Sequence, residues 1–275
     1  MIPKCIHQIW IGDQTVRPQS CMDTIKRDNP EWEYKLWTEK ELKTLKISKR
    51  LELKIKSCKQ ICGKADIYRY LILKQHGGVY IDADTLSIEP LEDFFLNNAG
   101  LAFENERTRG ELLAIGFMAF PSNHPLMDLL LQHIENNPIA GPAWQVTGNL
   151  LITNLVKQNQ DNFRLAIFPS YYFYPEHHTK DKYKGHGKVY LTQLWGSTYD
   201  KYKNNLNGVS PQGFLLEPAT SIDIHIPEDI SNSKMKDVLL GIKEMTGHYN
   251  INIHTKKDIK HFISLTRFCN WINTD

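Results

Sequence analysis

The spacing of apolar residues along this chain follows two patterns, one typical of strands and one typical of helices. Short apolar runs rich in β-branched and aromatic residues predict strands at 4–11, 33–37, 101–104, 115–120 and 163–168. Longer segments with apolar residues three and four positions apart predict helices at 18–27, 39–46, 49–58, 63–76, 124–136 and 145–158. This alternation is typical of an α/β protein whose mainly parallel sheet is flanked by helices.

One predicted helix and the strand after it lead into two acidic residues. The helix at 63–76 should stop at the glycine pair 77–78, because glycine accepts the left-handed backbone of a C-terminal cap. The apolar run 79–81 then leads to Asp82 and Asp84. Since side chains alternate along a strand, both carboxylates are expected on the same side.

Two anions on one face repel each other and are costly to desolvate unless a cation lies beside them. A divalent metal such as Mn²⁺ or Mg²⁺, bound to phosphate oxygens, suits hard oxygen ligands. Ligands of open α/β sheets also bind at strand ends. The pair therefore predicts a site for a nucleoside diphosphate; the alternative is that Asp82 and Asp84 only cap a turn into Thr85.

The run from Ala65 to Arg69, with the glycine pair and the segment 79–84, resembles the DXD core of glycosyltransferase family 32. The opening segment 2–12 resembles the first strand of that family. The family includes yeast-type mannosyltransferases and capsular sugar transferases of polysaccharide biosynthesis, and it is related to the large glucosylating toxins. The resemblance covers roughly residues 1–205 and implies a GT-A type nucleotide-sugar-binding fold.

The resemblance also implies roles for the motif residues. Asp84 is expected to ligate the metal directly, and Asp82 to act through water or to bind the ribose. Asp66 is expected to contact sugar hydroxyls, and Arg69 to lie near the sugar and the phosphates; the alternative is an exposed helix pair. Tyr80 shares the face of the acidic pair and is expected near the donor, or else to be a core residue.

Residues at the two ends of the matched region complete the expected site. Ile9 and Trp10 should lie beside the nucleotide, with the indole stacked on the base unless Trp10 is only a core residue. Ser197 is a candidate metal or phosphate ligand, and Trp195 a candidate lid or stacking residue. Gln193 stands where the family has a histidine.

Other polar residues carry weaker signals. The segment 145–149 resembles a Thr-Gly-Pro turn of the family, with Asn149 in place of proline. Glu104 and Glu106 could orient sugar or acceptor hydroxyls, or could be surface glutamates. The pair His177-His178 lies in the segment 175–187, which is predicted to be a solvated loop, so a metal site there is not expected.

At 275 residues the chain can hold a catalytic domain, predicted at 1–207, and a small α/β extension at 208–275. The extension should contain a strand at 221–226 and helices at 233–245 and 256–271. The net charge of +2 argues against a nucleic-acid partner. The basic stretch from Lys43 to Lys59 is expected to be a solvated helix face, although it could support peripheral contact with an anionic membrane.

The chain has no apolar segment of the ~20 residues that a membrane span requires, and Lys4 and His7 interrupt its N-terminal apolar run. Its five cysteines are odd in number and scattered, so reduced thiols in a cytoplasmic protein are expected. The function indicated is a retaining, metal-dependent hexosyltransferase that uses a UDP- or GDP-sugar and a glycan, protein or other hydroxyl acceptor. The alternatives are a degenerate nucleotide-sugar-binding protein and a phosphohydrolase of the haloacid-dehalogenase type.

Overall fold

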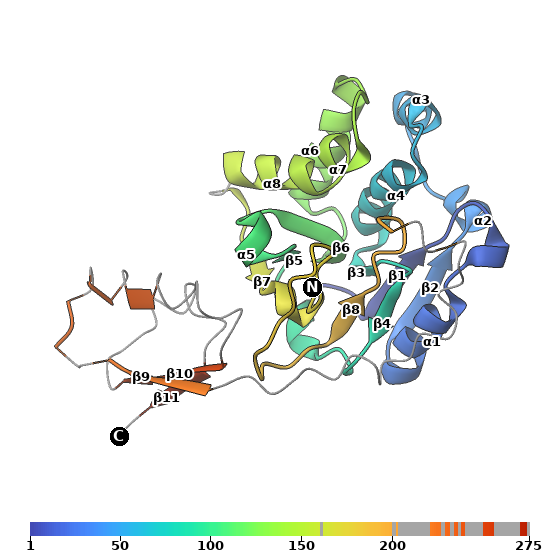
Figure 1. The fold of residues 1–275 in the computed structure, drawn as a ribbon. Coiled ribbons are helices and arrows are strands. Elements are labelled where there is room, and N and C mark those ends of the chain that lie inside the picture. Colours follow the sequence, from blue (N-terminus) through green and yellow to red (C-terminus); the bar gives the residue numbers. More distant parts are fainter. Residues whose placement is uncertain are drawn as a thin grey trace.

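The computed structural model describes residues 1–159, 162–199, 202, 221–226, 229–231, 234–235, 238–239, 250–255 and 270–273. Its central element is a six-stranded sheet in the order β2-β1-β3-β6-β5-β7 (Figure 1). These strands are β1 (Cys5–Ile9), β2 (Glu33–Trp37), β3 (Gly78–Ile81), β5 (Gly100–Phe103), β6 (Leu113–Phe120) and β7 (Ala166–Phe168). Within this sheet only β6 runs antiparallel to its neighbours, which confirms the expected α/β architecture with a mainly parallel sheet.

Helices flank both faces of this sheet. They are α1 (Gln19–Asp28), α2 (Glu39–Leu42), α3 (Lys49–Ser57), α4 (Ile61–His76), α5 (Glu106–Arg109), α6 (Pro125–Asn136), α7 (Ala143–Val146) and α8 (Asn149–Gln158). Short 3₁₀ turns lie at Gln14–Val16, Asp93–Leu96 and Ser170–Tyr172. None of the helices in the described part of the chain has the length and apolar character needed to cross a bilayer.

The strands distribute their side chains to two separate cores. In β3, Tyr80 packs with α4, α6 and α8, whereas Val79 and Ile81 pack on the opposite face with Ile25 of α1. The second core contains a cluster of aromatic rings around Phe95, which is fully buried. Because the period of a strand is two, one short apolar run contributes to both layers.

A two-stranded antiparallel ladder lies at the end of the sheet where β3 finishes. Its strands are β4 (Thr85–Ser87) and β8 (Leu191–Gln193), and Thr85 pairs directly with Gln193. The local sequence pattern did not predict either strand. The ladder joins the segment after the acidic pair to a segment more than 100 residues later in the chain.

Two expectations about secondary structure need correction. The helix predicted at 145–158 is interrupted, because α7 ends at Val146 and α8 begins at Asn149; the turn expected from the family resemblance is present instead. In the C-terminal part, the structure has a parallel sheet in the order β11-β10-β9. Its strands are β9 (Ser221–His225), β10 (Asn250–Thr255) and β11 (Asn270–Asn273).

The strand predicted at 221–226 is therefore confirmed, whereas the last residues of the helix predicted at 256–271 belong to β11. Residues 256–269 lie outside the described part of the chain, as does most of the helix predicted at 233–245. The division of the chain at residue 207 stays a prediction.

Gly77 ends α4 with a φ of 66°, and its N–H donates to the carbonyl of Leu73. A Cβ at this position would lie 2.6 Å from the backbone nitrogen of Ser122. We therefore expect Gly77→Ala to lower the free energy of unfolding by about 3 kcal/mol or more, measured by urea denaturation.

Gly110 provides a matched control, since it ends α5 at a φ of 58° with no atom within 4 Å of an added Cβ. Gly110→Ala should cost only the conformational strain, about 1 kcal/mol. Equal losses in the two variants would show that the contact with Ser122 is not what restricts position 77.

Candidate active site

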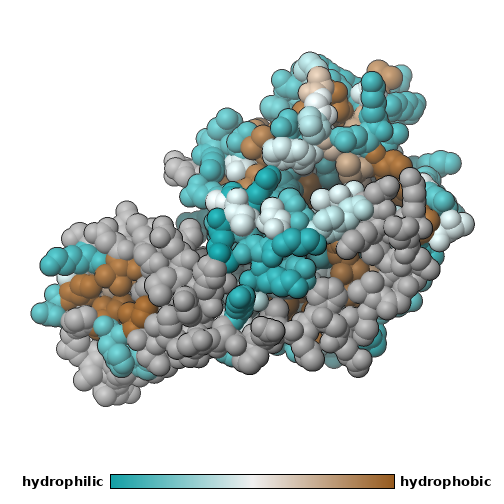
Figure 2. Space-filling view, viewed as in Figure 1, coloured by the Kyte–Doolittle hydropathy of each residue, from teal (hydrophilic) through white to brown (hydrophobic). Residues whose placement is uncertain are grey.

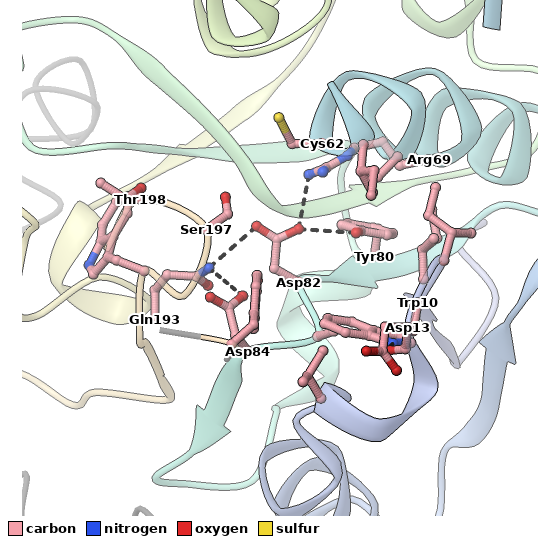
Figure 3. A pocket seen from close by; sticks show the side chains of 18 residues that line it. Trp10, Asp13, Cys62, Arg69, Tyr80, Asp82, Asp84, Gln193, Ser197 and Thr198 are labelled. Atoms are coloured by element: carbon pink, nitrogen blue, oxygen red, sulfur yellow. Dashed lines mark hydrogen bonds and ion pairs between the residues drawn. The ribbon is translucent and has the colours of Figure 1, made fainter. Parts of the chain in front are cut away.

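A cavity of about 630 Å³ opens where β1 and β3 end, next to the N-terminal half of α4. Figure 3 shows both acidic side chains in it, with Trp10 to one side and Gln193 and Ser197 to the other. Among the residues that the sequence predicted for the site, those lining the cavity are Ile9, Trp10, Arg69, Tyr80, Asp82, Asp84, Trp195 and Ser197.

The acidic pair follows β3 and lies in the turn between β3 and β4. The backbone N–H of Asp82 still donates to the carbonyl of Gly116, and Gln8 of β1 donates to the carbonyl of Asp82 at 3.0 Å. The amide nitrogen of Gln193 lies 2.8 Å from Oδ1 of Asp84 and 3.5 Å from Oδ2 of Asp82. Both carboxylates therefore face the amide nitrogen of Gln193, although the turn beyond β3, and not the alternation of a strand, directs them there.

Asp84 is the more buried member of the pair. Its Oδ2 accepts a hydrogen bond of 2.6 Å from the backbone N–H of Gly196, and the hydroxyl of Tyr202 also donates to it. The pKa of Asp84 is raised to about 6, mainly by burial and to a smaller extent by the negative charge of Asp82. A bound cation would relieve both effects, because it stabilises the charged carboxylate.

Arg69 lies between the acidic pair and the interior of the protein. Its guanidinium is 3.2 Å from Oδ1 of Asp82 and 3.0 Å from Oδ1 of Asp66, and its side chain is only 5% exposed. It also donates to the carbonyl of Ile115 and lies 4.4 Å above the ring of Tyr80. Burial alone would lower the pKa of Arg69, but Tyr80 and the two carboxylates raise it overall. The exposed helix pair considered from the sequence is therefore wrong.

Asp66 does not line the cavity but lies behind Arg69, where it is buried. Its Oδ2 accepts a hydrogen bond of 2.8 Å from the hydroxyl of Thr147, in the turn between α7 and α8. Burial raises the pKa of Asp66 to about 6, although Arg69 and Thr147 act in the opposite direction. The role in binding sugar hydroxyls stays a prediction.

The aromatic residues of the site lie on the side of β1 and at the mouth of the cavity. Trp10 is mostly buried, donates to the carbonyl of Asp13 and contacts Tyr202 edge-to-face at 5.1 Å. Tyr80 is also buried, and its hydroxyl donates to Oδ1 of Asp82 at 3.0 Å. Both rings therefore pack in the interior and also line the cavity. For each residue, the role in the core and the role in binding are compatible.

The residues at the cavity fit a divalent metal. Asp82 and Asp84 offer hard oxygen ligands that converge on one point, and the hydroxyl of Ser197 lies at the same cavity. Gln193 faces the same pair, since its Oε1 accepts from Thr85 at 2.5 Å and its amide nitrogen is directed at the carboxylates.

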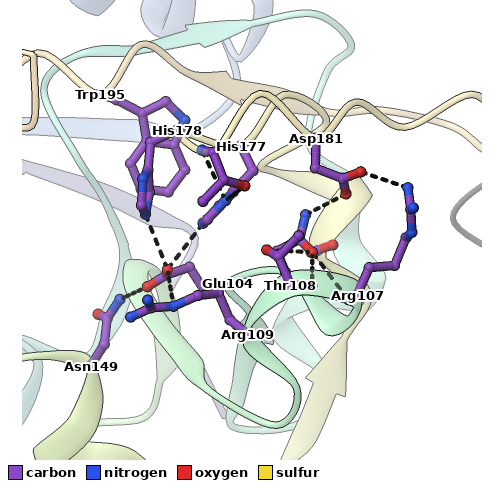
Figure 4. A network of polar contacts seen from close by, with 12 residues as sticks. Glu104, Arg107, Thr108, Arg109, Asn149, His177, His178, Asp181 and Trp195 are labelled. Carbon is purple, nitrogen blue, oxygen red and sulfur yellow. Dashed lines mark hydrogen bonds and ion pairs between the residues drawn. The ribbon is translucent and has the colours of Figure 1, made fainter.

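A second polar network lies behind Trp195 and corrects two expectations (Figure 4). Glu104 is buried rather than exposed and accepts from the amide of Asn149. The exposed residues of the loop at 175–187 are hydrophilic. Figure 2 shows hydrophilic residues at the centre of this face of the molecule. His177, which belongs to this loop, is nevertheless fully buried and lies 3.0 Å from Glu104.

The sequence alone did not single out Gln8 or Tyr202 as site residues. Gln8 is fully buried in β1, where it connects the hydroxyl of Tyr34 to the carbonyl of Asp82. A polar residue inside an apolar strand was the available signal for it. Tyr202 lies near the end of the region that the resemblance covers, and no local pattern indicated its contact with Asp84.

Comparison with known proteins bears on this site. Residues 15–101 match the family described as "Glycosyltransferase sugar-binding region containing DXD motif". The chain is 31% identical over 144 residues to inositol phosphoceramide mannosyltransferase 3 of Schizosaccharomyces pombe, covering 50% of this chain and 37% of the relative. It is 29% identical over 198 residues to an uncharacterized glycosyltransferase of Acanthamoeba polyphaga mimivirus, covering 66% of this chain and 76% of the relative.

Among solved structures, the PaToxG glycosyltransferase aligns with a TM-score of 0.47 and 17% identity, over 58% of this chain and 71% of that one. The described sheet is mainly parallel and flanked by helices, and the acidic pair follows one of its central strands. The region matched by the family contains Asp66, Arg69, Asp82 and Asp84. These matches show that part of the chain is similar to glycosyltransferases that contain a DXD motif, and the chain spans only 37% of the Schizosaccharomyces pombe relative.

Removal of the guanidinium would leave Asp66 and Asp82 without their shared cation. We expect Arg69→Met to lower the free energy of unfolding by about 3–5 kcal/mol near neutral pH. The pKa of Asp66 is already raised in the folded protein and would rise further, so the folded variant binds a proton more tightly than the unfolded chain. Its stability is then retained at low pH and lost as the pH rises through the folded pKa.

Urea denaturation at about pH 5 and about pH 8 should therefore show the larger loss at about pH 8. Arg27→Met is the control, because it removes an exposed guanidinium that pairs with Asp28. It should cost less than about 1 kcal/mol at both pH values. A loss for Arg69→Met that is no larger than this would contradict the assigned role of Arg69.

Proposed function

We propose that this protein is a retaining, divalent-metal-dependent glycosyltransferase that moves a hexose from a nucleoside diphosphate sugar to a hydroxyl acceptor. The observation that carries the proposal is the convergence of Asp82 and Asp84 in one cavity. A volume of about 630 Å³ suits a ligand of nucleotide-sugar size. The indole of Trp10, at the end of β1, would lie against the base.

In this proposal the residues of the site have different roles. Asp84, with Asp82 and Ser197, would hold Mn²⁺ or Mg²⁺, which neutralises charge on the leaving diphosphate when bound. Arg69 fixes Asp82 and Tyr80 in position before any ligand enters, so little reorganisation is needed on binding. Asp66, which lies behind Arg69 and is held by Thr147, would act on the bound sugar by positioning the guanidinium of Arg69.

The names of the relatives support a hexose donor and a hydroxyl acceptor. One relative is named as a mannosyltransferase that acts on inositol phosphoceramide, and the other as a glycosyltransferase. For this chain we propose a UDP- or GDP-sugar as donor, and a glycan, a protein or another hydroxyl compound as acceptor. A cytoplasmic location and a catalytic domain at 1–207 with an extension at 208–275 belong to the same proposal.

The test is turnover of a panel of UDP- and GDP-sugars with Mn²⁺ or Mg²⁺. We expect Asp84→Asn to abolish donor hydrolysis and transfer, because it removes one metal ligand, while the thermal unfolding temperature stays close to that of the wild type. EDTA should have the same effect on the wild type. Asp93→Asn is a matched control, since it removes a carboxylate that is 75% exposed outside the cavity.

Full activity of the Asp84→Asn variant would overturn the assignment of the metal site. NMR of the first glycoside formed tests retention, because the one-bond coupling constant between C1 and H1 reports the anomeric configuration of the product. Binding of a nucleotide sugar without turnover of any donor would favour a degenerate binding protein. Hydrolysis of simple phosphate esters, with no use of nucleotide sugars, would favour a phosphohydrolase.

A further inference from the structure

Three ligating side chains converge outside the acidic pair. Oε1 of Glu104 lies 3.0 Å from Nε2 of His177 and 3.6 Å from Nε2 of His178. The three atoms all lie within 4.8 Å of one another. Figure 4 shows both imidazoles directed at the same carboxylate. A carboxylate and two imidazoles form a common ligand set for zinc, and such sites often leave the fourth position open.

The local backbone explains how adjacent histidines reach one point. The two rings lie 4.0 Å apart at an angle of 42°, so they flank the carboxylate rather than point to opposite sides of the chain. The carbonyl of Glu176 accepts from the indole of Trp195 at 2.8 Å, and the carbonyl of His178 accepts from the hydroxyl of Tyr199 at 2.7 Å. These contacts hold the segment on both sides of the pair.

Further contacts orient the ligands as outer-shell partners of metal sites do. Nδ1 of His177 lies 2.8 Å from the hydroxyl of Thr179 and accepts a hydrogen bond of 3.3 Å from the backbone N–H of the same residue, so without a metal Nε2 carries the proton toward Glu104, and a metal ion would replace that proton. The amide of Asn149 donates to Oε2 of Glu104, which leaves Oε1 directed at the histidines. The ring of Trp195 contacts both imidazoles edge-to-face, at 5.1 and 5.0 Å, and supplies an apolar wall.

We propose that Glu104, His177 and His178 form a binding site for a divalent transition metal ion of the zinc type. This site is separate from the acidic pair and does not depend on the proposed transfer activity. It uses one oxygen and two nitrogen ligands, whereas the acidic pair offers oxygen ligands that suit Mn²⁺ or Mg²⁺.

Arg109 occupies the remaining side of the carboxylate in this structure. Its Nε is 3.2 Å from Oε1 of Glu104, and its side chain is 32% exposed. The guanidinium also lies 5.4 Å from the ring of Trp144, which is itself exposed and offers it a second contact. Arg109 therefore acts as a cation that a metal ion would displace toward solvent.

This arrangement makes a prediction that a purely structural network does not make. Removal of His178 should weaken metal binding, because a ligand is lost, whereas removal of Arg109 should strengthen it, because a competing cation is lost. His178 and Arg109 are both partly exposed, so these variants should fold. Replacement of the buried Glu104 or His177 is a less informative test, since it could disrupt folding.

The experiment is isothermal titration of the full chain with Zn²⁺ in the Asp84→Asn background, which weakens the acidic pair as a competing site. We expect one Zn²⁺ per chain, a loss of affinity of about tenfold or more in His178→Ala, and a gain in Arg109→Met. His186→Ala is the control, because it removes an exposed histidine of the same loop, and it should bind as the parent does. Co²⁺ should give the visible absorption bands of a four-coordinate nitrogen and oxygen site, and His178→Ala should lose them.

Two results would overturn the site. The first is the absence of Zn²⁺ binding, at micromolar concentrations, to the parent and to Arg109→Met. The second is equal affinity in His178→Ala and His186→Ala, which would assign any bound zinc to other residues. Neither result bears on turnover of nucleotide sugars, so failure of this proposal is distinct from failure of the proposed function.

Discussion

The buried guanidinium of Arg69 is the interaction on which the site depends. It joins α4 to the acidic pair through Asp82 and to β6 through the carbonyl of Ile115, and it also pairs with Asp66 on the preceding turn of α4. An unpaired charge at this depth would cost several kcal/mol, so each of these partners restricts where the others can lie. The position of Asp82 in the cavity therefore follows from the packing of a helix against two strands. A ligand meets a carboxylate that is already fixed.

Asp84 is fixed by a different mechanism. The ladder of β4 and β8 places Gln193 and the backbone of Gly196 against its two oxygens, so a distant segment closes the site. One acidic residue thus depends on the motif helix and the other on a strand pair. Two separate sets of contacts, from α4 and from the strand pair, therefore hold the like-charged carboxylates beside each other. A cation shared by both carboxylates would require this arrangement.

The parts of this structure that the sequence predicted are those whose cause is local. The helix at 63–76, its glycine stop and the acidic pair follow from periodicity and capping over a few neighbouring residues. The contact of Gln193 with Asp84 and the burial of His177 depend on pairings between segments far apart in the chain. Short strands such as β4 and β8 carry too few residues to show a period, so their partners decide whether they form.

Trp195 shows how the cavity and the second network depend on each other. It has a φ of 56°, a left-handed conformation that is unfavourable for a residue with a bulky side chain. The hydrogen bond from its indole to Glu176 and its contacts with His177 and His178 compensate for this strain. Because the same indole lines the cavity of the acidic pair, the histidine network fixes one wall of that cavity. Any change that loosens the network should therefore alter the cavity through the position of this ring.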